Sequence, residues 1–97
     1  MSDLSYERLS SSDIESRVAQ LDGWSVVEGM LTKEFKFDAY ASGVVFASAV
    51  GHTADKLNHH PDLFVGYGKV RVSVLTHDAG GLTSYDFELA RRVEAIA

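Results

Sequence analysis

The residues that could do acid–base chemistry lie between positions 55 and 86. Three of the four histidines are there, namely His59, His60 and His77. Histidine titrates near neutral pH, so it can donate or accept a proton under physiological conditions. Asp55 and Asp86 belong to the same stretch, and buried ionisable groups cost free energy unless they are paired. This concentration of ionisable groups predicts an acid–base site rather than a part of the core.

Two adjacent histidines follow a predicted helix, and Asp55 lies one helical turn before the first of them. Interaction with the C-terminal helix dipole would be enough to explain a single histidine at this place. Because Asp55 and His59 are spaced i,i+4, the carboxylate can orient or charge the ring. For an adjacent pair with a carboxylate nearby, we favour a functional interpretation. We interpret His52, farther back on the helix, as a surface or interface residue.

The other candidate residues also have structural interpretations. Thr83 and Asp86 have the spacing of a capping box, in which the two side chains bond to free backbone N–H groups of a helix start. His77 alone would be an ordinary residue at a strand end, and Tyr67 alone a half-buried strand aromatic. Their combination with the histidine pair, at three separate joints of the fold, favours a site.

Competing chemistries have weaker support in the sequence. Zinc can bind histidine and carboxylate ligands, but there is no HExxH spacing, and the side chains of adjacent histidines diverge. Gly80-Gly81 has neither of the glycine patterns that bind phosphates. There is also no GxSxG motif to indicate a serine hydrolase. The residues therefore do not favour a metal site, a nucleotide site or a hydrolase triad.

Length and composition narrow the class of protein. A chain of 97 residues suits one domain over 1–97, and its 45% hydrophobic and 24% charged residues are ordinary for a globular protein. The net charge of -5 and the lack of a basic run argue against nucleic-acid binding. The absence of cysteine excludes disulfides and thiolate chemistry. With no signal-like or membrane-spanning stretch, we expect a cytoplasmic protein that does not bind membranes.

The sequence predicts an N-terminal arm, a first helix and four strands. Residues 1–9 are polar and aperiodic, which indicates a loose arm. Ser10, Ser11 and Ser12 each offer an N-cap, and Ser12 with Glu15 has capping-box spacing. Apolar residues at helical spacing then extend a helix to about Leu21. Period-two alternation indicates antiparallel strands with one covered face. The strands are predicted near residues 24–27, 31–37, 63–67 and 70–77, with turns at Glu28-Gly29 and Gly68.

A longer second helix, about residues 39–58, is predicted with Asp38 as its cap. Asn58 and Pro61 end it, because a residue before proline is pushed out of helical geometry. A third helix starts at Thr83. The order α-β-β-α-β-β-α predicts an α+β two-layer sandwich, a four-stranded antiparallel sheet with helices on one face. The predicted apolar faces are Tyr40, Val44, Ala47, Val50, Ala54 and Leu57 in the second helix, and Phe87, Ala90, Val93 and Ala97 in the third.

The spacing of the site residues resembles the motif of the pterin-4a-carbinolamine dehydratase family. The matching residues are Asp55, His59-His60-Pro61, Tyr67, His77 and Asp86. Neighbouring residues are similar too, including the Leu-Asp-Gly-Trp ending at Trp24, and the resemblance covers nearly the whole chain beyond the arm. One position departs, because the family often has tryptophan where this chain has Leu63. That change would alter the wall of the pocket without removing an ionisable group.

The resemblance implies a hydro-lyase that removes water from 4a-hydroxytetrahydropterin to give quinonoid dihydropterin, recycling the cofactor of aromatic amino-acid hydroxylases. It implies no metal or organic cofactor, since the pterin is the substrate, and a homodimer or homotetramer. The alternative is a non-catalytic dimerisation or assembly partner, but the three retained histidines favour the enzyme. The implied site residues are catalytic His59, His60 and His77, supporting carboxylates Asp55 and Asp86, and substrate-binding Pro61 and Tyr67.

Overall fold

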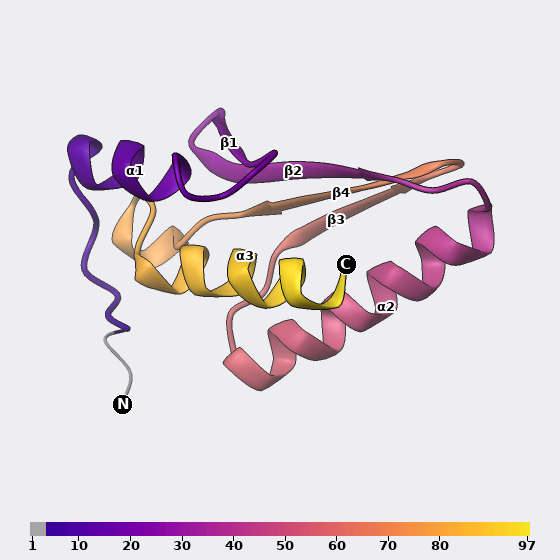
Figure 1. Cartoon of the computed structure of the whole chain (residues 1–97). Helices are drawn as coiled ribbons and strands as arrows, with labels where there is room; N and C mark the ends of the chain where they lie inside the picture. Colours follow the sequence, from indigo (N-terminus) through magenta and orange to yellow (C-terminus); the bar gives the residue numbers. More distant parts are fainter. Residues whose placement is uncertain (1–3) are drawn as a thin grey trace.

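The computed structural model describes residues 4–97 and has the two-layer α+β architecture predicted from the sequence (Figure 1). A four-stranded antiparallel sheet forms one layer, and helices α2 and α3 lie side by side across one of its faces. The elements are α1 (Ser11–Val18), β1 (Ser25–Val27), β2 (Met30–Lys36), α2 (Tyr40–Leu57), β3 (Asp62–Gly66), β4 (Lys69–Val74), the 3₁₀ turn η1 (His77–Ala79) and α3 (Ser84–Ile96).

The strand order β1-β2-β4-β3 determines where the candidate residues emerge from the sheet. β3 and β4 are antiparallel, and Asp62 at the start of β3 pairs with Ser73 near the end of β4. The residues just before β3 and just after β4 therefore lie at the same end of the sheet. His60 lies shortly before β3 and His77 shortly after β4. The β3–β4 hairpin therefore brings together two histidines that are far apart in the sequence.

Alternation in the two central strands builds the core. Val70, Val72 and Val74 of β4 are almost fully buried, and Leu31 and Phe35 of β2 are buried beside them. The registers pair Leu31 with Val74 and Phe35 with Val70, so these side chains share the face covered by α2 and α3. Burying such side chains contributes about 1.5–3 kcal/mol each before the cost of ordering the chain. The sheet end that carries the histidines is thus attached to the most rigid part of the fold.

Lys33, a charged residue among the apolar positions of β2, is held by Glu94 near the end of α3. Its Nζ lies 2.7 Å from Glu94 Oε2, and it also donates to the backbone oxygen of Asp22 at 3.0 Å. The indole Nε1 of buried Trp24 donates to the same Glu94 oxygen at 2.8 Å. This carboxylate satisfies two donors at once, and it joins the last turn of α3 to β2 and to the loop before β1.

The buried face of α2 differs from the predicted one. Val50, Ala54 and Leu57 are buried as predicted, but Tyr40 is 53% and Val44 42% exposed. The buried face is rotated about the helix axis. Its N-terminal part is formed by Gly43 and Phe46 in place of Tyr40 and Val44. A Cβ on Gly43 would lie 3.4 Å from Val70, so the small residue permits close contact with β4. The buried residues of α2 are Gly43, Phe46, Val50, Ala54 and Leu57.

Two predicted helix caps are wrong. α1 is capped by Ser10, whose side chain accepts from the N–H of Asp13, and not by Ser12. The backbone N–H of Leu9 donates to Leu82 at 2.8 Å, so the chain is already fixed at the residue before Ser10. α1 also ends at Val18 rather than Leu21. At α2 the cap position is Ala39, which makes no side-chain bond, because the helix starts one residue beyond the position that Asp38 could cap.

The turn between β1 and β2 has the predicted position and a strained residue. Val27 pairs with Met30, so the turn consists of Glu28 and Gly29, with φ angles of 51° and 82°. Two-residue hairpins favour this mirror-image turn because its twist matches that of the strands. Glycine adopts positive φ without cost, whereas a glutamate there brings its Cβ close to the backbone.

We expect Glu28→Asn to stabilise the protein, because asparagine tolerates the left-handed conformation that glutamate resists. The free energy of unfolding in urea should rise by roughly 0.5–1 kcal/mol. Glu28→Gln is the matched control, since it removes the same charge but keeps a side chain with no preference for positive φ. Equal stability of the two variants would show that the turn geometry is not the cause.

Candidate active site

The centre of the site is a buried hydrogen bond between His59 and Asp86. His59 Nε2 lies 2.7 Å from Asp86 Oδ1, and the two residues are 8% and 0% exposed. An ionised carboxylate can only accept, so the proton of this bond is on Nε2 of the ring. The other ring nitrogen, Nδ1, is then the one available to the pocket. The carboxylate thereby fixes both the orientation and the tautomer of His59.

The second oxygen of Asp86 caps α3. Oδ2 accepts from the backbone N–H of Thr83 and from the hydroxyl of Thr76, each at 2.8 Å. The Thr83 hydroxyl in turn bonds with Thr76 at 2.8 Å and accepts from the N–H of Tyr85, which completes the predicted capping box. Asp86 therefore forms the predicted capping box through one oxygen and contacts His59 through the other.

Asn58 turns the chain so that the two adjacent histidines separate. It ends α2 in the left-handed conformation, with φ 55°, and the N–H of His59 then bonds back to Ala54 at 3.1 Å. Asparagine is one of the few residues other than glycine that adopt this conformation routinely. As a result His59 points into the protein, whereas His60 is exposed.

Asp55 pairs with His60, and the prediction that it pairs with His59 is wrong. Asp55 Oδ1 lies 2.8 Å from His60 Nε2, with 74% and 57% of the two side chains exposed. The i,i+4 rule holds only within a helix, and the left-handed Asn58 intervenes before His59. Because both partners are open to water, this pair is screened and contributes little to stability. Its effect is to hold the His60 ring at the rim of the site.

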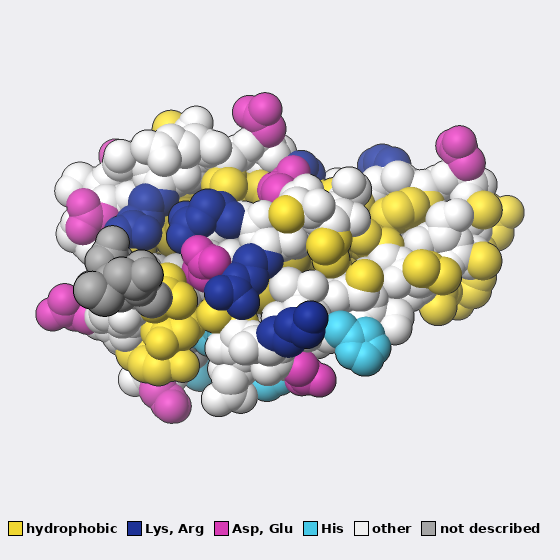
Figure 2. Space-filling view, turned by 60° about the horizontal axis from the view of Figure 1, so that its bottom comes forward, with side chains coloured by type: hydrophobic (Ala, Val, Ile, Leu, Met, Phe, Trp, Pro, Cys, Tyr) yellow, Lys and Arg dark blue, Asp and Glu magenta, His cyan; other side chains and the backbone are white. Residues whose placement is uncertain are grey.

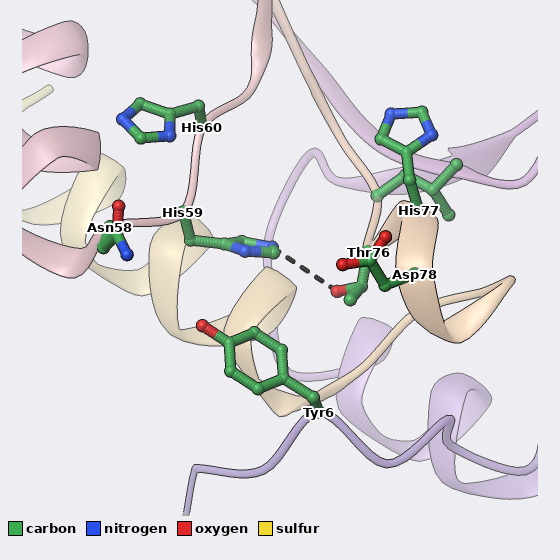
Figure 3. A pocket seen from close by; sticks show the side chains of 8 residues that line it. Tyr6, Asn58, His59, His60, Thr76, His77 and Asp78 are labelled. Carbon is green, nitrogen blue, oxygen red and sulfur yellow. Dashed lines mark hydrogen bonds between the residues drawn. The ribbon is translucent and has the colours of Figure 1, made fainter.

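A cavity of about 480 Å³ lies over these groups (Figure 3). His59 points across it toward Thr76, whose hydroxyl lies 3.5 Å from Nε2, while His60 and His77 stand on the side opposite Tyr6. The end of α2, the start of η1 and the N-terminal arm thus each supply a wall. The lining residues are Tyr6, Asn58, His59, His60, Leu75, Thr76, His77 and Asp78.

The structure brings together five of the seven predicted site residues. The three histidines line the cavity, and Asp86 and Asp55 contact it through His59 and His60. Pro61 and Tyr67 are not among the residues of 4–97 that line it. Pro61 borders a neighbouring depression, and Tyr67 is in the turn between β3 and β4, 80% exposed and stacked on Tyr40. That turn is at the other end of the hairpin from the histidines.

Sequence reasoning did not predict five of the lining residues as site residues, namely Tyr6, Asn58, Leu75, Thr76 and Asp78. Of these, Thr76 bonds to Asp86 and Tyr6 lies beside the His59 ring. Thr76 lies in the family-like stretch before His77, but its bond to Asp86 depends on the pairing of Thr76 with Gly81, which brings β4 to the start of α3. Tyr6 belongs to the aperiodic arm, for which no pattern predicts a position. Only a three-dimensional contact could have identified either residue.

The described surface favours none of the competing classes. Acidic side chains lie next to basic ones in the space-filling view, and histidine is visible along the lower edge of that face (Figure 2). Within residues 4–97, no group of three or more His, Cys, Asp or Glu side chains is placed to hold a metal ion. In the same range no helix is long and apolar enough to cross a membrane. These findings leave the cavity as the feature that carries chemistry.

Fold and cavity together define a small α+β protein with a buried histidine–carboxylate pair beneath a cavity. The family model for pterin 4 alpha carbinolamine dehydratase matches residues 7–96. A Rhizobium etli protein that bears the family's name is 43% identical, with 94% of this chain and 92% of that protein covered. One from Solibacter usitatus is 38% identical, with 93% and 95% covered. The chain belongs to the pterin-4a-carbinolamine dehydratase family.

Solved structures agree with this assignment. The crystal structure of a transcriptional coactivator/pterin dehydratase from Brucella melitensis superposes with a TM-score of 0.88 at 35% identity, and covers 94% of this chain and 99% of that one. A pterin dehydratase-like protein described as a RuBisCO assembly factor in the alpha-carboxysome has a TM-score of 0.61 at 25% identity, over 76% and 86% of the two chains. The fold is therefore that of the family.

We expect Asp86→Asn to change the tautomer of His59 while keeping the helix cap. The amide oxygen can still accept from Thr83 and Thr76, but the amide nitrogen now donates to His59 Nε2, which moves the ring proton to Nδ1. Nitrogen-15 NMR of labelled histidine should show this exchange, and dehydratase turnover should fall by roughly 10²-fold or more. The urea midpoint should change little.

Asp86→Ala is the matched comparison, because it removes the cap as well. It should lose turnover and also at least roughly 0.5–2 kcal/mol of unfolding free energy, the usual cost of a lost cap. An Asn variant with the proton still on Nε2 and normal turnover would show that Asp86 is a structural residue only.

Proposed function

We propose that this chain dehydrates 4a-hydroxytetrahydropterin to quinonoid dihydropterin, and so recycles the pterin cofactor of aromatic amino-acid hydroxylases. The observation that carries the proposal is the buried His59–Asp86 pair beneath a cavity with two further histidines at its rim. Membership of the family supplies the substrate class. The cavity volume of about 480 Å³ is within the usual range for small-molecule sites.

The reaction needs one base and one acid. A proton leaves N5 of the pterin, the hydroxyl on C4a leaves with a proton as water, and a C4a=N5 double bond forms. We assign the base to His59, which lines the cavity and whose Nδ1 carries no proton in the assigned tautomer. When that nitrogen accepts the N5 proton, the imidazolium is stabilised by the Asp86 carboxylate at 2.7 Å. Because this pair is buried, the attraction is screened far less than at the surface.

The acid function is assigned to the exposed histidines. Hydroxide leaves poorly unless it is protonated, and an imidazolium is an effective proton donor near neutral pH. His60 and His77 flank the cavity from the end of α2 and the start of η1 (Figure 3). Asp55 Oδ1 lies 2.8 Å from His60 Nε2 and holds that ring at the rim of the cavity. In this proposal His59 acts as the base on one side of the substrate, and His60 or His77 acts as the acid on the other.

A non-catalytic assembly role is the alternative function. The solved structure described as a RuBisCO assembly factor has the same fold but is a more distant match than the Brucella melitensis protein. An assembly partner has no need for a histidine held in one tautomer by a buried carboxylate. The His59–Asp86 pair therefore favours the enzyme.

We expect purified protein to accelerate dehydration of 4a-hydroxypterin generated in the assay, and to do so after exhaustive treatment with EDTA. The physical reason is that histidines and carboxylates alone supply both proton transfers. Quinonoid dihydropterin formation is followed by absorbance. Activity that disappears on chelation and returns with zinc would replace this mechanism with a metal-dependent one.

We expect His59→Gln to lower turnover by roughly 10²–10⁴-fold, the contribution of a general acid or base. Single alanine variants of His60 and His77 should also lose turnover. His52→Ala is the matched control, because this fourth histidine is exposed on α2 and does not line the cavity. The assay is a progress curve at saturating substrate, with circular dichroism to verify the fold. Near-normal rates in all three site variants would refute acid–base catalysis here.

We also propose that the protein self-associates. β3 is an edge strand of the sheet, and Leu63, Phe64 and Val65 on it are 36%, 45% and 37% exposed. An unpaired edge with apolar side chains is a ready site for strand addition. We expect sedimentation velocity to show a dimer or tetramer at micromolar concentration. A monomer under these conditions would contradict the proposal.

A further inference from the structure

The N-terminal arm is held against the site on both sides of Tyr6. On one side, the N–H of Ser5 donates to the Ser84 hydroxyl at 2.8 Å, and that hydroxyl donates to the Ser5 carbonyl at 3.1 Å. On the other side, the N–H of Leu9 donates to Leu82 at 2.8 Å. Leu4 and Leu9 also pack against the core. Residues 4–9 form no helix or strand, but they are anchored at the start of α3, so the prediction of a loose arm is wrong for them. Residues 1–3 of the predicted arm lie outside the described residues.

These anchors place the Tyr6 ring in an aromatic cluster with the catalytic centre. Tyr6 stacks on Tyr85 with 4.1 Å between ring centroids and 9° between planes. The His59 ring lies 6.4 Å from Tyr6 and 5.7 Å from Tyr85. Tyr6 remains 53% exposed while it lines the cavity, so Tyr85 supports it from one side and part of its surface is open.

The charged and the aromatic walls of the cavity face each other. His60 and His77 lie on one side, and Tyr6 lies on the other with its hydroxyl directed toward the end of α2 (Figure 3). Desolvation and the neighbouring Tyr85 raise the pKa of Tyr6 above its ordinary value, so the phenol is neutral where histidines titrate. Tyr6 therefore offers a flat, uncharged surface on the side opposite His60 and His77 (Figure 3).

Position 6 lies just outside the region that the family model matches, residues 7–96. Tyr67, the aromatic position within the motif, is in a turn at the other end of the hairpin. Among residues 4–97, Tyr6 and not Tyr67 is therefore the tyrosine that lines this cavity.

We propose that Tyr6 is a substrate-binding residue, and that the arm presents its ring as the wall against which the flat heteroaromatic ring of the substrate stacks. Aromatic rings in contact prefer offset stacking or edge-to-face arrangements, and these contacts add affinity beyond that gained from the buried area. The proposal rests on the proposed function for the identity of the substrate, a reduced pterin. Because the contact is the same before and after water leaves, it contributes to binding more than to the chemical step.

The test compares Tyr6→Ala and Tyr6→Phe with wild type in two measurements, dehydratase kinetics and equilibrium binding of biopterin. Tyr6→Ala should raise KM and the biopterin Kd by roughly 3–10-fold, with kcat within about twofold of wild type. Tyr6→Phe should restore both constants, because the ring remains. Tyr40→Ala is the matched control. Tyr40 is also 53% exposed and stacked on a tyrosine, but it does not line the cavity.

The outcomes separate this inference from the function on which it rests. If wild type is active and Tyr6→Ala leaves KM and Kd unchanged, the function stands and the role of Tyr6 is refuted. If wild type binds biopterin through Tyr6 but does not dehydrate the substrate, the binding role stands and the proposed activity fails. If wild type neither binds nor dehydrates a pterin, both are overturned. A Tyr6→Ala variant that loses kcat and melting temperature instead would show that the arm is only structural.

Discussion

A buried carboxylate needs hydrogen-bond donors, and Asp86, which has no exposure to water, has three: the ring of His59, the hydroxyl of Thr76 and the backbone N–H of Thr83. The Thr83 hydroxyl bonds in turn with Thr76. Removing any one of these donors would leave a buried polar group unsatisfied, which costs about 1–3 kcal/mol. Among the described residues, no buried side-chain nitrogen or oxygen lacks a partner. The end of β4, the start of α3 and the end of α2 are thus fixed relative to one another by a single residue.

Most of the fold could be predicted because its elements are encoded locally. Period-two alternation in β2 and β4, the Glu28-Gly29 turn and the Asn58 ending of α2 each depend on a few neighbouring residues. The errors occur where long-range contacts select among equivalent local choices. Three consecutive serines can all cap α1, and the bond from Leu9 to Leu82 selects Ser10. The face of α2 is likewise decided by whether Gly43 or Val44 can approach Val70.

The site was predictable as a set of residues but not as a set of contacts. His59, His60 and His77 were identified from type and spacing, and they do share one cavity. The hydrogen-bond partner of each histidine could not be predicted from residue type and spacing. A helical spacing rule joined Asp55 to His59, but the left-handed residue between them transfers that contact to His60. Tyr6 lies in a segment without periodicity, so only folding shows that it is near His59.

The left-handed Asn58 also gives the two adjacent histidines different access to water. The His59 ring is buried with Nε2 bonded to Asp86, whereas the side chain of its neighbour, His60, is 57% exposed. The proposed dehydration consumes no net proton, since one is taken from the substrate and one is returned with the departing water. Each turnover nevertheless leaves the two rings with exchanged charges. To restore the starting charges, a proton must pass between the buried His59 ring and the solvent. The left-handed backbone at Asn58 places His59 on the inner side of the protein surface and His60 on the outer side.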